Sequence, residues 1–248
     1  MKKAAVAILN WNGKSLLEKF LPGVLENTPP EIADIIIADN GSTDDSIEFI
    51  KREFPEVEII LLDKNYGFAG GYNRALEQVE AENYIILNSD IEVTKDWLLP
   101  LIAKLEFSSA CIPVIGAHYN KESFEYAGAS GGFIDKYGYP FCRGRIIDTL
   151  EKDLGQYEQD RSVFWATGAC LAIKREVFNS MGGFDADFFA HMEEIDLCWR
   201  MKNQGHEIQV VTNSIVYHVG GGTLPNESPN KLYLNFRNGL FLLYKNLP

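Results

Sequence analysis

Several common features are scarce or absent in this sequence of 248 residues. Its four cysteines, at positions 111, 142, 170 and 198, stand too far apart for a zinc knuckle or a redox motif, so we expect free thiols. Positive charge is also scarce: the net charge is −12, which argues against a nucleic-acid-binding surface. No apolar run reaches the ~18 residues that cross a bilayer, and the first residues lack the pattern of a secretory signal. We therefore expect a cytoplasmic protein that binds no nucleic acid.

Short apolar runs alternate with helical patterns over the first 120 residues. The runs are rich in Ile and Val, as buried strands are, and lie at 4–9, 35–38, 58–62, 84–87 and 112–117. The helical patterns between them cover 16–25, 44–53, 71–80 and 95–107. We expect a break in the first helix near Pro22 and a cap on the second from Ser42 or Thr43. The alternation predicts an α/β fold with a mostly parallel central sheet and helices on both faces.

The pattern changes after residue 118. Glycines interrupt short aromatic stretches over 120–160, which is typical of hairpins or loops. We then expect a strand at 163–173, helices at 175–181 and 192–203, strands at 207–211 and 215–218, and a helix at 230–247. No repeat and no linker divides the chain, so we expect one domain over 1–248.

Polar residues follow the first three predicted strands, and ligands of such sheets bind beyond the carboxyl ends of the strands. After the first strand, Asn10, Trp11 and Asn12 could stack on and hydrogen-bond a base, or form an ordinary turn. After the second, Asp39 could accept from a base N–H or a ribose hydroxyl, or belong to a helix start. After the third, the glycine-rich segment 65–73 leads into a helix and would let the backbone approach a ligand.

The fourth strand runs into Asn88, Ser89 and Asp90. Mg²⁺ and Mn²⁺ take oxygen ligands and commonly use one or two carboxylates together with substrate phosphates, so Asp90 suits a divalent metal. A turn or helix-cap aspartate is the alternative. His218 stands at the end of a late strand, before glycines at 220–222, and is either a further metal ligand or a structural histidine.

Two adjacent acids, Glu193 and Glu194, stand at the start of a predicted helix. The helix dipole would keep a carboxylate ionised there, and such a carboxylate could act as a general base. Solvated acids on a helix face are the alternative. Asp196 and Arg200 are four residues apart and are expected to pair for structure.

In this order along the chain, the motifs resemble those of family 2 glycosyltransferases, most closely the rhamnosyltransferase-like branch of bacterial polysaccharide synthesis. The segments that carry the resemblance are 10–13, 39–42, 65–73, 88–90, 182–185 and 193–200. The resemblance implies the A-type glycosyltransferase (GT-A) fold. It also implies a nucleotide-sugar-binding half at 1–118 and an acceptor half with a C-terminal helix at 119–248.

The resemblance further implies an inverting transfer from a nucleotide-sugar donor, dTDP-rhamnose or a UDP-sugar, to a glycan or lipid-linked acceptor with Mg²⁺ or Mn²⁺ as cofactor. The residues that it assigns to the nucleotide sugar are Asn10, Trp11, Asp39, Asn73, Asn88 and Ser89. It assigns Asp90 and His218 to the metal. It gives the role of base to Glu194, with Glu193 as the alternative because the family usually has Asp at the second position. Asn88 replaces the first acid of the family's Asp-x-Asp signature, which leaves the number of protein ligands open.

Two rival functions are a sugar nucleotidyltransferase and a non-catalytic nucleotide-sugar-binding protein. The first would need a glycine-rich loop with a basic residue near the N-terminus, and Asn12-Gly13-Lys14 is a poor match. The C-terminal segment is apolar and its only charges are basic, at Lys231, Arg237 and Lys245. This composition is typical of peripheral contact with a membrane, or of a helix packed on the domain or on a second subunit.

Overall fold

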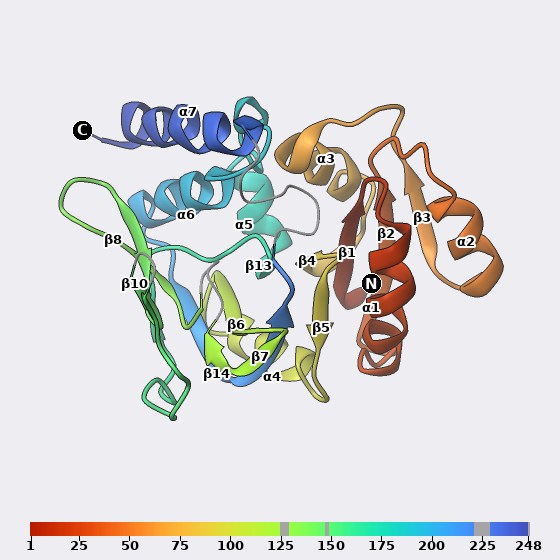
Figure 1. The fold of residues 1–248 in the computed structure, drawn as a ribbon, viewed down its shortest axis with the longest axis horizontal. Helices are drawn as coiled ribbons and strands as arrows, with labels where there is room; N and C mark the ends of the chain where they lie inside the picture. Colours follow the sequence, from red (N-terminus) through yellow and green to blue (C-terminus); the bar gives the residue numbers. More distant parts are fainter. Residues whose placement is uncertain (125–128, 147–148, 221–228, 248) are drawn as a thin grey trace.

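The computed structural model describes residues 1–124, 129–146, 149–220 and 229–247, and the glycines at 221 and 222 lie outside these ranges. The main sheet has the order β12-β14-β6-β13-β4-β1-β2-β3 and is extended by β5 beside β14 and β7 beside β6 (Figure 1). Its strands are β1 (Lys2–Asn10), β2 (Ala33–Asp39), β3 (Glu58–Leu61), β4 (Ala81–Asn88), β5 (Ile91–Val93), β6 (Ala110–Ala117), β7 (Asn120–Phe124), β12 (Arg161–Ser162), β13 (Cys170–Lys174) and β14 (Ile208–His218). A small second sheet contains β8 (Gly132–Ile134), β9 (Pro140–Cys142), β10 (Arg145–Ile146) and β11 (Thr149–Leu150).

Strand direction decides which loops meet at one edge of the main sheet. Strands β1, β2, β3 and β4 run parallel to one another, and β6 and β14 run parallel to each other. Between these groups β13 runs antiparallel to both β4 and β6. Its first residue, Cys170, pairs with Leu87 near the end of β4. The loop that leads into β13 therefore reaches the edge where the parallel strands end.

Helices cover both faces of the sheet, as the sequence predicts (Figure 1). One face carries α1 (Lys14–Glu26), α2 (Ser46–Glu53) and α4 (Leu98–Leu105), and the other carries α3 (Gly67–Leu76), α5 (Arg175–Ser180) and α6 (Glu193–Asn203), with α7 (Pro229–Asn246) packed against α6. Alternate residues of β1 serve the two cores: Ala5 and Ala7 belong to the core under α3, α5 and α6, and Val6 and Ile8 to the core under α1, α2 and α4. Because both faces are buried, the strands are continuous apolar runs. The predicted α/β class and sheet are confirmed.

Two local predictions about helices are wrong. The first helix is not broken near Pro22 but runs on to Glu26. Its buried face, which includes Leu21 and Val24, is held on the sheet on both sides of the proline. Helix α2 begins at Ser46 without a side-chain cap. The hydroxyl of Ser42 accepts from the backbone N–H of Asn12 instead, so it joins the ends of β1 and β2.

Two strand predictions also need correction. The run at 163–173 is a strand only from Cys170, and the loop before it turns toward the sheet edge. The two late strands are one strand, β14, whose pairing with β6 shifts register between Val211 and Ile215. This irregularity explains why the apolar pattern reads as two pieces.

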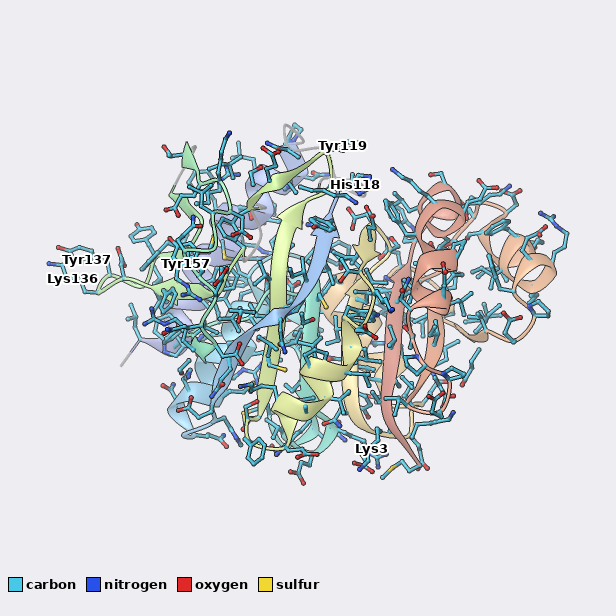
Figure 2. All side chains as sticks on the ribbon, turned by 90° about the horizontal axis from the view of Figure 1, so that it is seen from below. Lys3, His118, Tyr119, Lys136, Tyr137 and Tyr157 are labelled. Carbon is cyan, nitrogen blue, oxygen red and sulfur yellow. The ribbon has the colours of Figure 1, made fainter. Side chains whose placement is uncertain are left out.

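The two ends of the strands in the main sheet lie on opposite sides of the molecule. Lys3, near the start of β1, lies at one edge, whereas His118 and Tyr119, just after β6, lie at the other (Figure 2). The polar motifs of the sequence follow strands that end at the His118 edge. Within the described ranges, no helix combines the length and apolar character that a membrane span requires.

The hydroxyl of Tyr72 ties α3 to the carboxyl ends of two strands. It donates to the carbonyl of Leu87 in β4 (3.0 Å) and accepts from the N–H of Leu9 in β1 (3.3 Å). The side chain is fully buried, and burial raises the pKa of the hydroxyl above its ordinary range.

We expect Tyr72→Phe to lower the free energy of unfolding by about 1–2 kcal/mol because buried polar groups lose their partner. Urea unfolding measures this, with Tyr119→Phe, an exposed tyrosine, as control; equal loss in both variants would contradict it.

Candidate active site

Asp90 and His218 are brought together by a short strand pairing. Strand β5 pairs antiparallel with the end of β14, so that Ile91 lies opposite His218. Asp90 immediately precedes Ile91, and its Oδ1 lies 3.1 Å from Nε2 of His218. The N–H of Val219 donates to the Asp90 carbonyl (3.2 Å), which fixes the backbone as well. Both side chains are buried, at 4% and 7% exposure, so their positions are set by the fold.

The Asp90–His218 pair fits a divalent cation. Two ligands at right angles on an octahedral ion, each about 2.1 Å from it, lie about 3 Å apart, and the observed separation is 3.1 Å. A carboxylate oxygen and an imidazole nitrogen together suit Mn²⁺, and the carboxylate alone suits Mg²⁺. In the described part of the chain no cluster of three acidic, histidine or cysteine side chains surrounds the pair. Such an ion commonly also takes substrate phosphate oxygens as ligands.

Asn10 organises the ends of β1 and β2. Its buried amide nitrogen donates to Oδ1 of Asp39 (3.0 Å), to the hydroxyl of Ser42 (3.1 Å) and to that of Ser46 (3.0 Å). The other oxygen of Asp39 accepts from the N–H of Ser42 (3.0 Å). A carboxylate has about four lone-pair sites, so Asp39 keeps acceptor capacity after both bonds. Trp11, which follows Asn10 in the chain, is 39% exposed and has a ring face that a base could stack on.

Ser89 and Asn88 lie at this edge, but Asn73 does not belong to it. Both Ser89 and Asn88 are half-buried, and the Ser89 hydroxyl lies near Gly13 at the end of β1. Asn73 is in the second half of α3, where its amide donates to the carbonyl of Phe184 (2.7 Å) and accepts from the same residue's N–H (3.0 Å). This two-way bond occupies the side chain, so we leave Asn73 out of the nucleotide site.

Glu193 and Glu194 open α6, and both are poorly hydrated. Glu193 is 3% exposed and Glu194 is half-buried. Burial raises the pKa of Glu193 well above its usual range, and the charge of Glu194 adds to the shift. Burial also raises the pKa of Glu194, although backbone N–H groups, including that of Gly168, oppose the shift. One oxygen of each carboxyl, Oε2, has no hydrogen-bond partner among the residues the structure describes.

A short chain of contacts links the acids to the Asp90 region. Gly168, whose N–H interacts with Glu194, precedes Ala169. The carbonyl of Ala169 accepts from the N–H of Asn88 (2.9 Å), two residues before Asp90. Because β13 is antiparallel to β4, this loop lies at the ends of the parallel strands. The acids and the Asp90–His218 pair therefore share one edge of the sheet, as the motifs predict.

The backbone that enters α6 is strained, which the sequence did not signal. Phe189, His191 and Met192 have φ values of 65°, 72° and 72°, and none of them is glycine. Residues held in sparsely populated backbone regions cost about 1–3 kcal/mol each and cluster at functional sites.

Burial lowers the pKa of His191 to about 4, and Lys231 adds to the shift, so the imidazole is neutral at pH 7.

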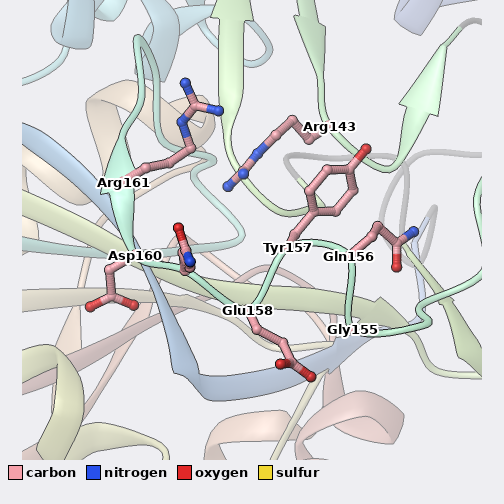
Figure 3. Close-up of a pocket in the computed structure, with 8 residues that line it drawn as sticks. Arg143, Gly155, Gln156, Tyr157, Glu158, Asp160 and Arg161 are labelled. Carbon is pink, nitrogen blue, oxygen red and sulfur yellow. The ribbon is translucent and has the colours of Figure 1, made fainter.

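A cavity of about 650 Å³ lies elsewhere, beside the small sheet, and is lined by Arg143 and residues 155–161 (Figure 3). Arg143 stacks over the ring of Tyr157 at 4.7 Å. The lining is mixed in charge, since Arg161 is balanced by Glu158 and Asp160. It contains none of the strand-end residues described above, so we place the candidate active site at the sheet edge and not in this cavity.

Comparison with known proteins gives one family match and several distant relatives. Residues 5–182 match the sequence profile of glycosyl transferase family 2. The chain is 26% identical over 226 residues to an N-acetylglucosaminyl-diphospho-decaprenol L-rhamnosyltransferase of Mycobacterium tuberculosis, covering 84% of this chain and 73% of that protein. It is 23% identical to a low-salt glycan biosynthesis hexosyltransferase of Haloferax volcanii, covering 84% of this chain and 66% of that one.

Solved structures are similar in fold. A structure of GalNAc-T7 with UDP, GalNAc and Mn²⁺ superposes with a TM-score of 0.74 at 18% identity, covering 98% of this chain and 48% of that one. A mannosyltransferase of Pyrobaculum calidifontis in complex with GDP-Man and Mn²⁺ gives 0.61 at 18% identity, covering 88% and 56%. The chain thus spans about half the length of these two proteins. At this identity the likeness establishes the fold alone.

The raised pKa of Glu193 makes a prediction about stability. Below the ordinary carboxyl pKa both folded and unfolded states are protonated, and Glu193→Gln should change little. As the pH rises, the unfolded chain releases the proton while the folded state retains it, so the wild type loses about 1.4 kcal/mol for each unit of pKa elevation. We expect Glu193→Gln to be more stable than wild type at pH 8 and equal to it at pH 4.

Urea unfolding at the two pH values measures this difference. Glu77→Gln, on the exposed side of α3's C-terminal end, is the matched control. The expectation fails if the gain is the same at both pH values, or if the control shows it too.

Proposed function

The chain belongs to glycosyl transferase family 2 and is rhamnosyltransferase-like in sequence, and from this we propose that it is an inverting, metal-dependent glycosyltransferase. It has the GT-A fold. The donor is a nucleotide-diphosphate sugar, dTDP-rhamnose or a UDP-sugar, and the acceptor is a hydroxyl of a glycan or lipid-linked glycan in cell-surface polysaccharide synthesis. Residues 1–118 bind the donor and residues 119–248 the acceptor. The observation that carries the proposal is the shared edge of the Asp90–His218 pair and the two acids that open α6.

Asp90 and His218 would hold Mg²⁺ or Mn²⁺, which supplies positive charge to the donor's diphosphate. The two similar structures contain Mn²⁺ together with UDP or GDP-Man, which supports a divalent cation in this fold. Asn88 and Ser89, at the end of β4, lie beside Asp90 and are placed to hydrogen-bond the donor. Trp11 offers a ring face to the base, and Asp39 can accept from the base or ribose while Asn10 fixes its orientation.

Glu194 is the better candidate for the base. Both acids have a raised pKa, which brings them toward the operating pH of a general base. Glu194 is half-buried, whereas Glu193 is closed off at 3% exposure. A base must reach the proton that it removes, so the buried Glu193 is assigned a place beside the base, where burial and the charge of Glu194 raise its own pKa.

The reaction is then a single displacement. The acceptor oxygen attacks the anomeric carbon, its proton passes to the Glu194 carboxylate, and the bond from the anomeric carbon to the diphosphate oxygen breaks. The electron pair of that bond leaves with the nucleoside diphosphate. Attack from the side opposite the leaving group inverts the anomeric centre. Holding donor and acceptor in line supplies much of the rate, because a bimolecular step becomes effectively unimolecular.

Two substitutions test these roles separately. We expect Glu194→Gln to lower kcat about 10²–10⁴-fold, the range for a positioned base, with nucleotide binding retained. We expect Asp90→Ala to abolish most transfer and also to weaken Mn²⁺-dependent nucleotide binding. Transfer is measured with dTDP-rhamnose, UDP-sugars and GDP-mannose, and binding by thermal shift, where a ligand at 100 times its Kd stabilises by about 2.7 kcal/mol.

The same assays separate the rival functions. Release of pyrophosphate from a nucleoside triphosphate and a sugar phosphate would identify a sugar nucleotidyltransferase. Metal-dependent donor binding with neither transfer nor donor hydrolysis would identify a non-catalytic nucleotide-sugar-binding protein, a reading that the Asn88 substitution keeps open. Full activity of Glu194→Gln would remove this residue from the role of base.

We further propose that α7 contacts the inner face of the cell membrane, which would keep a cytoplasmic enzyme near a lipid-linked acceptor. One face of α7 is apolar and between 60% and 90% exposed, and it consists of Leu232, Tyr233, Phe236, Leu240 and Tyr244. The helix contains no acid, and its charge is carried by Lys231, by Arg237, which also bonds the carbonyls of Asp187 and Phe188, and by Lys245, which pairs with Asp185 and Asp196. Basic residues beside an exposed apolar stripe favour binding to anionic lipid surfaces.

Vesicle flotation tests this contact. We expect the protein to float with vesicles that contain phosphatidylglycerol and not with neutral phosphatidylcholine vesicles, because charge and apolar burial act together. Phe236→Asp with Leu240→Asp should abolish flotation, while the double substitution Leu61→Asp with Leu99→Asp, at exposed sites away from α7, should not. A stable dimer through this face with no flotation would instead assign it to a second subunit.

A further inference from the structure

The segment that joins the short helix η1 (Ala186–Phe188) to α6 has a backbone that its residues do not favour. Three of its four residues, Phe189, His191 and Met192, have φ between 65° and 72°. L side chains rarely adopt this region, so the surrounding structure must hold the segment in place. The segment ends directly at Glu193 and Glu194, and its geometry therefore decides where the two carboxyls lie.

Helix α3 holds one end of the segment. The first free N–H groups of α3, those of Phe68 and Ala69, donate to the carbonyl of Phe189 at 2.6 and 3.2 Å. The carbonyl dipole is favoured there by the positive end of the helix. Gly67, with φ of 72°, makes the approach possible, because a Cβ at this position would lie 2.5 Å from the Phe189 oxygen.

Helix α7 holds the rest of the segment through one buried amide. Asn238 has no exposed surface, and its Nδ2 donates to the carbonyls of Phe188 (2.9 Å), Ala190 (2.8 Å) and His191 (2.6 Å). Three acceptors thus converge on one nitrogen. The acceptor side of the same amide is used as well, since Oδ1 accepts from Nε of Arg237 (2.9 Å).

Arg237 adds a second set of bonds to the same backbone. Its Nη2 donates to the carbonyls of Phe188 (2.8 Å) and Asp187 (2.9 Å), in the short helix before the strained segment. The guanidinium is a permanent donor with no acceptor capacity. Adjacent residues of α7 therefore supply donors to carbonyls on both sides of Phe189, where the backbone changes direction.

The start of α6 depends on this arrangement. Met192 is the residue before the helix, and its carbonyl accepts from the N–H of Asp196 (2.9 Å) as the first helical bond. If Met192 or His191 relaxed to an ordinary φ, the first turn of α6 would rotate and take the two glutamates with it. The amide of Asn238 opposes this relaxation because its bonds to the carbonyls of Phe188, Ala190 and His191 would be lost if these carbonyls moved.

We propose that Asn238, with Arg237, is a positioning residue of this enzyme: it holds the strained entrance of α6 and thereby sets the position and burial of Glu194 and Glu193. Neither residue touches the reacting groups. The inference rests on the proposed function for its effect on catalysis, but its effect on the acid pair can be measured without a substrate.

Asn238→Asp is the sharpest variant because it keeps the shape of the side chain. The nitrogen that donates to three carbonyls is replaced by an oxygen, which can only accept when the carboxylate is ionised. We expect kcat to fall about 100-fold, the effect of a displacement of about 1 Å at a catalytic group, while the KM for the donor changes less than about threefold. The acid limb of the pH profile should move to lower pH, because displaced glutamates become better hydrated. Arg237→Met keeps the length of the side chain and removes its donors. It should lower kcat and shift the acid limb of the pH profile in the same direction as Asn238→Asp, but by less.

Two controls separate positioning from general weakening of α7. Asn235→Asp makes the same chemical change one turn earlier on the helix, at a half-buried position, and should leave kcat and the pH profile unchanged. Leu242→Ala removes buried packing of α7 without altering any donor to the segment. It should lower Tm while the acid limb of the pH profile stays in place. A shifted acid limb in Leu242→Ala, equal to that of Asn238→Asp, would overturn the proposal.

A second measurement does not need activity. The gain in stability at pH 8 from Glu193→Gln is compared in the wild-type, Asn238→Asp and Arg237→Met backgrounds. If Asn238 and Arg237 set the burial of the acid pair, the gain shrinks in both backgrounds. An undiminished gain overturns the proposal even if transfer is impaired. Full activity of Glu194→Gln would instead refute the assigned base, and the stability comparison would still decide the role of Asn238.

Discussion

The pairing of three residues, 91–93, with the end of β14 is the constraint on which the site depends. It turns the chain back immediately after Asp90 and places this carboxylate 3.1 Å from His218, a residue 128 positions later. Two buried polar groups at that distance are stable only if each finds a partner, either the other residue or an ion between them. The end of β4 is therefore held at the sheet edge by β14, and the donor end of the site exists only when the late strand is in place.

The antiparallel strand β13 has the second decisive role. Because it enters the sheet at the carboxyl end of β4, its preceding loop joins the Asp90 region to the glutamates of α6 through Gly168 and Ala169. The glutamates themselves are displaced from ordinary helix-start geometry by a strained entrance, whose cost of about 1–3 kcal/mol per residue must be offset by neighbouring contacts. The bonds from α3 and α7 to this entrance provide them. The site is thus assembled from parts of the chain that lie far apart in sequence and is supported by a terminal helix outside the sheet.

Much of the sheet and of the edge that carries the site could be predicted from the sequence. Strands buried on both faces are continuous apolar runs, and the polar residues that follow them mark one edge. The positions of Asp90 and His218 at that edge follow from this rule, whereas the two glutamates open a helix and were assigned to the site by the family resemblance. The break at Pro22 was wrong because burial of Leu21 and Val24 outweighs the single hydrogen bond that proline removes. Asn73 was misplaced because a local motif does not show that an amide is occupied by Phe184, 111 residues away. The strained φ values at 189–192 and the amide of Asn238 had no local signal either, because long-range contacts create them.

The central claim is that a divalent cation is held between Asp90 and His218. Electron spin echo envelope modulation of bound Mn²⁺, in the presence of UDP, GDP or dTDP, detects a directly coordinated imidazole nitrogen and changes in a known way when histidine is labelled with ¹⁵N. The account predicts one such nitrogen in the wild type and none in His218→Ala. Bound Mn²⁺ without an imidazole nitrogen in the wild type, or with the same nitrogen signal after His218 is replaced, would contradict it.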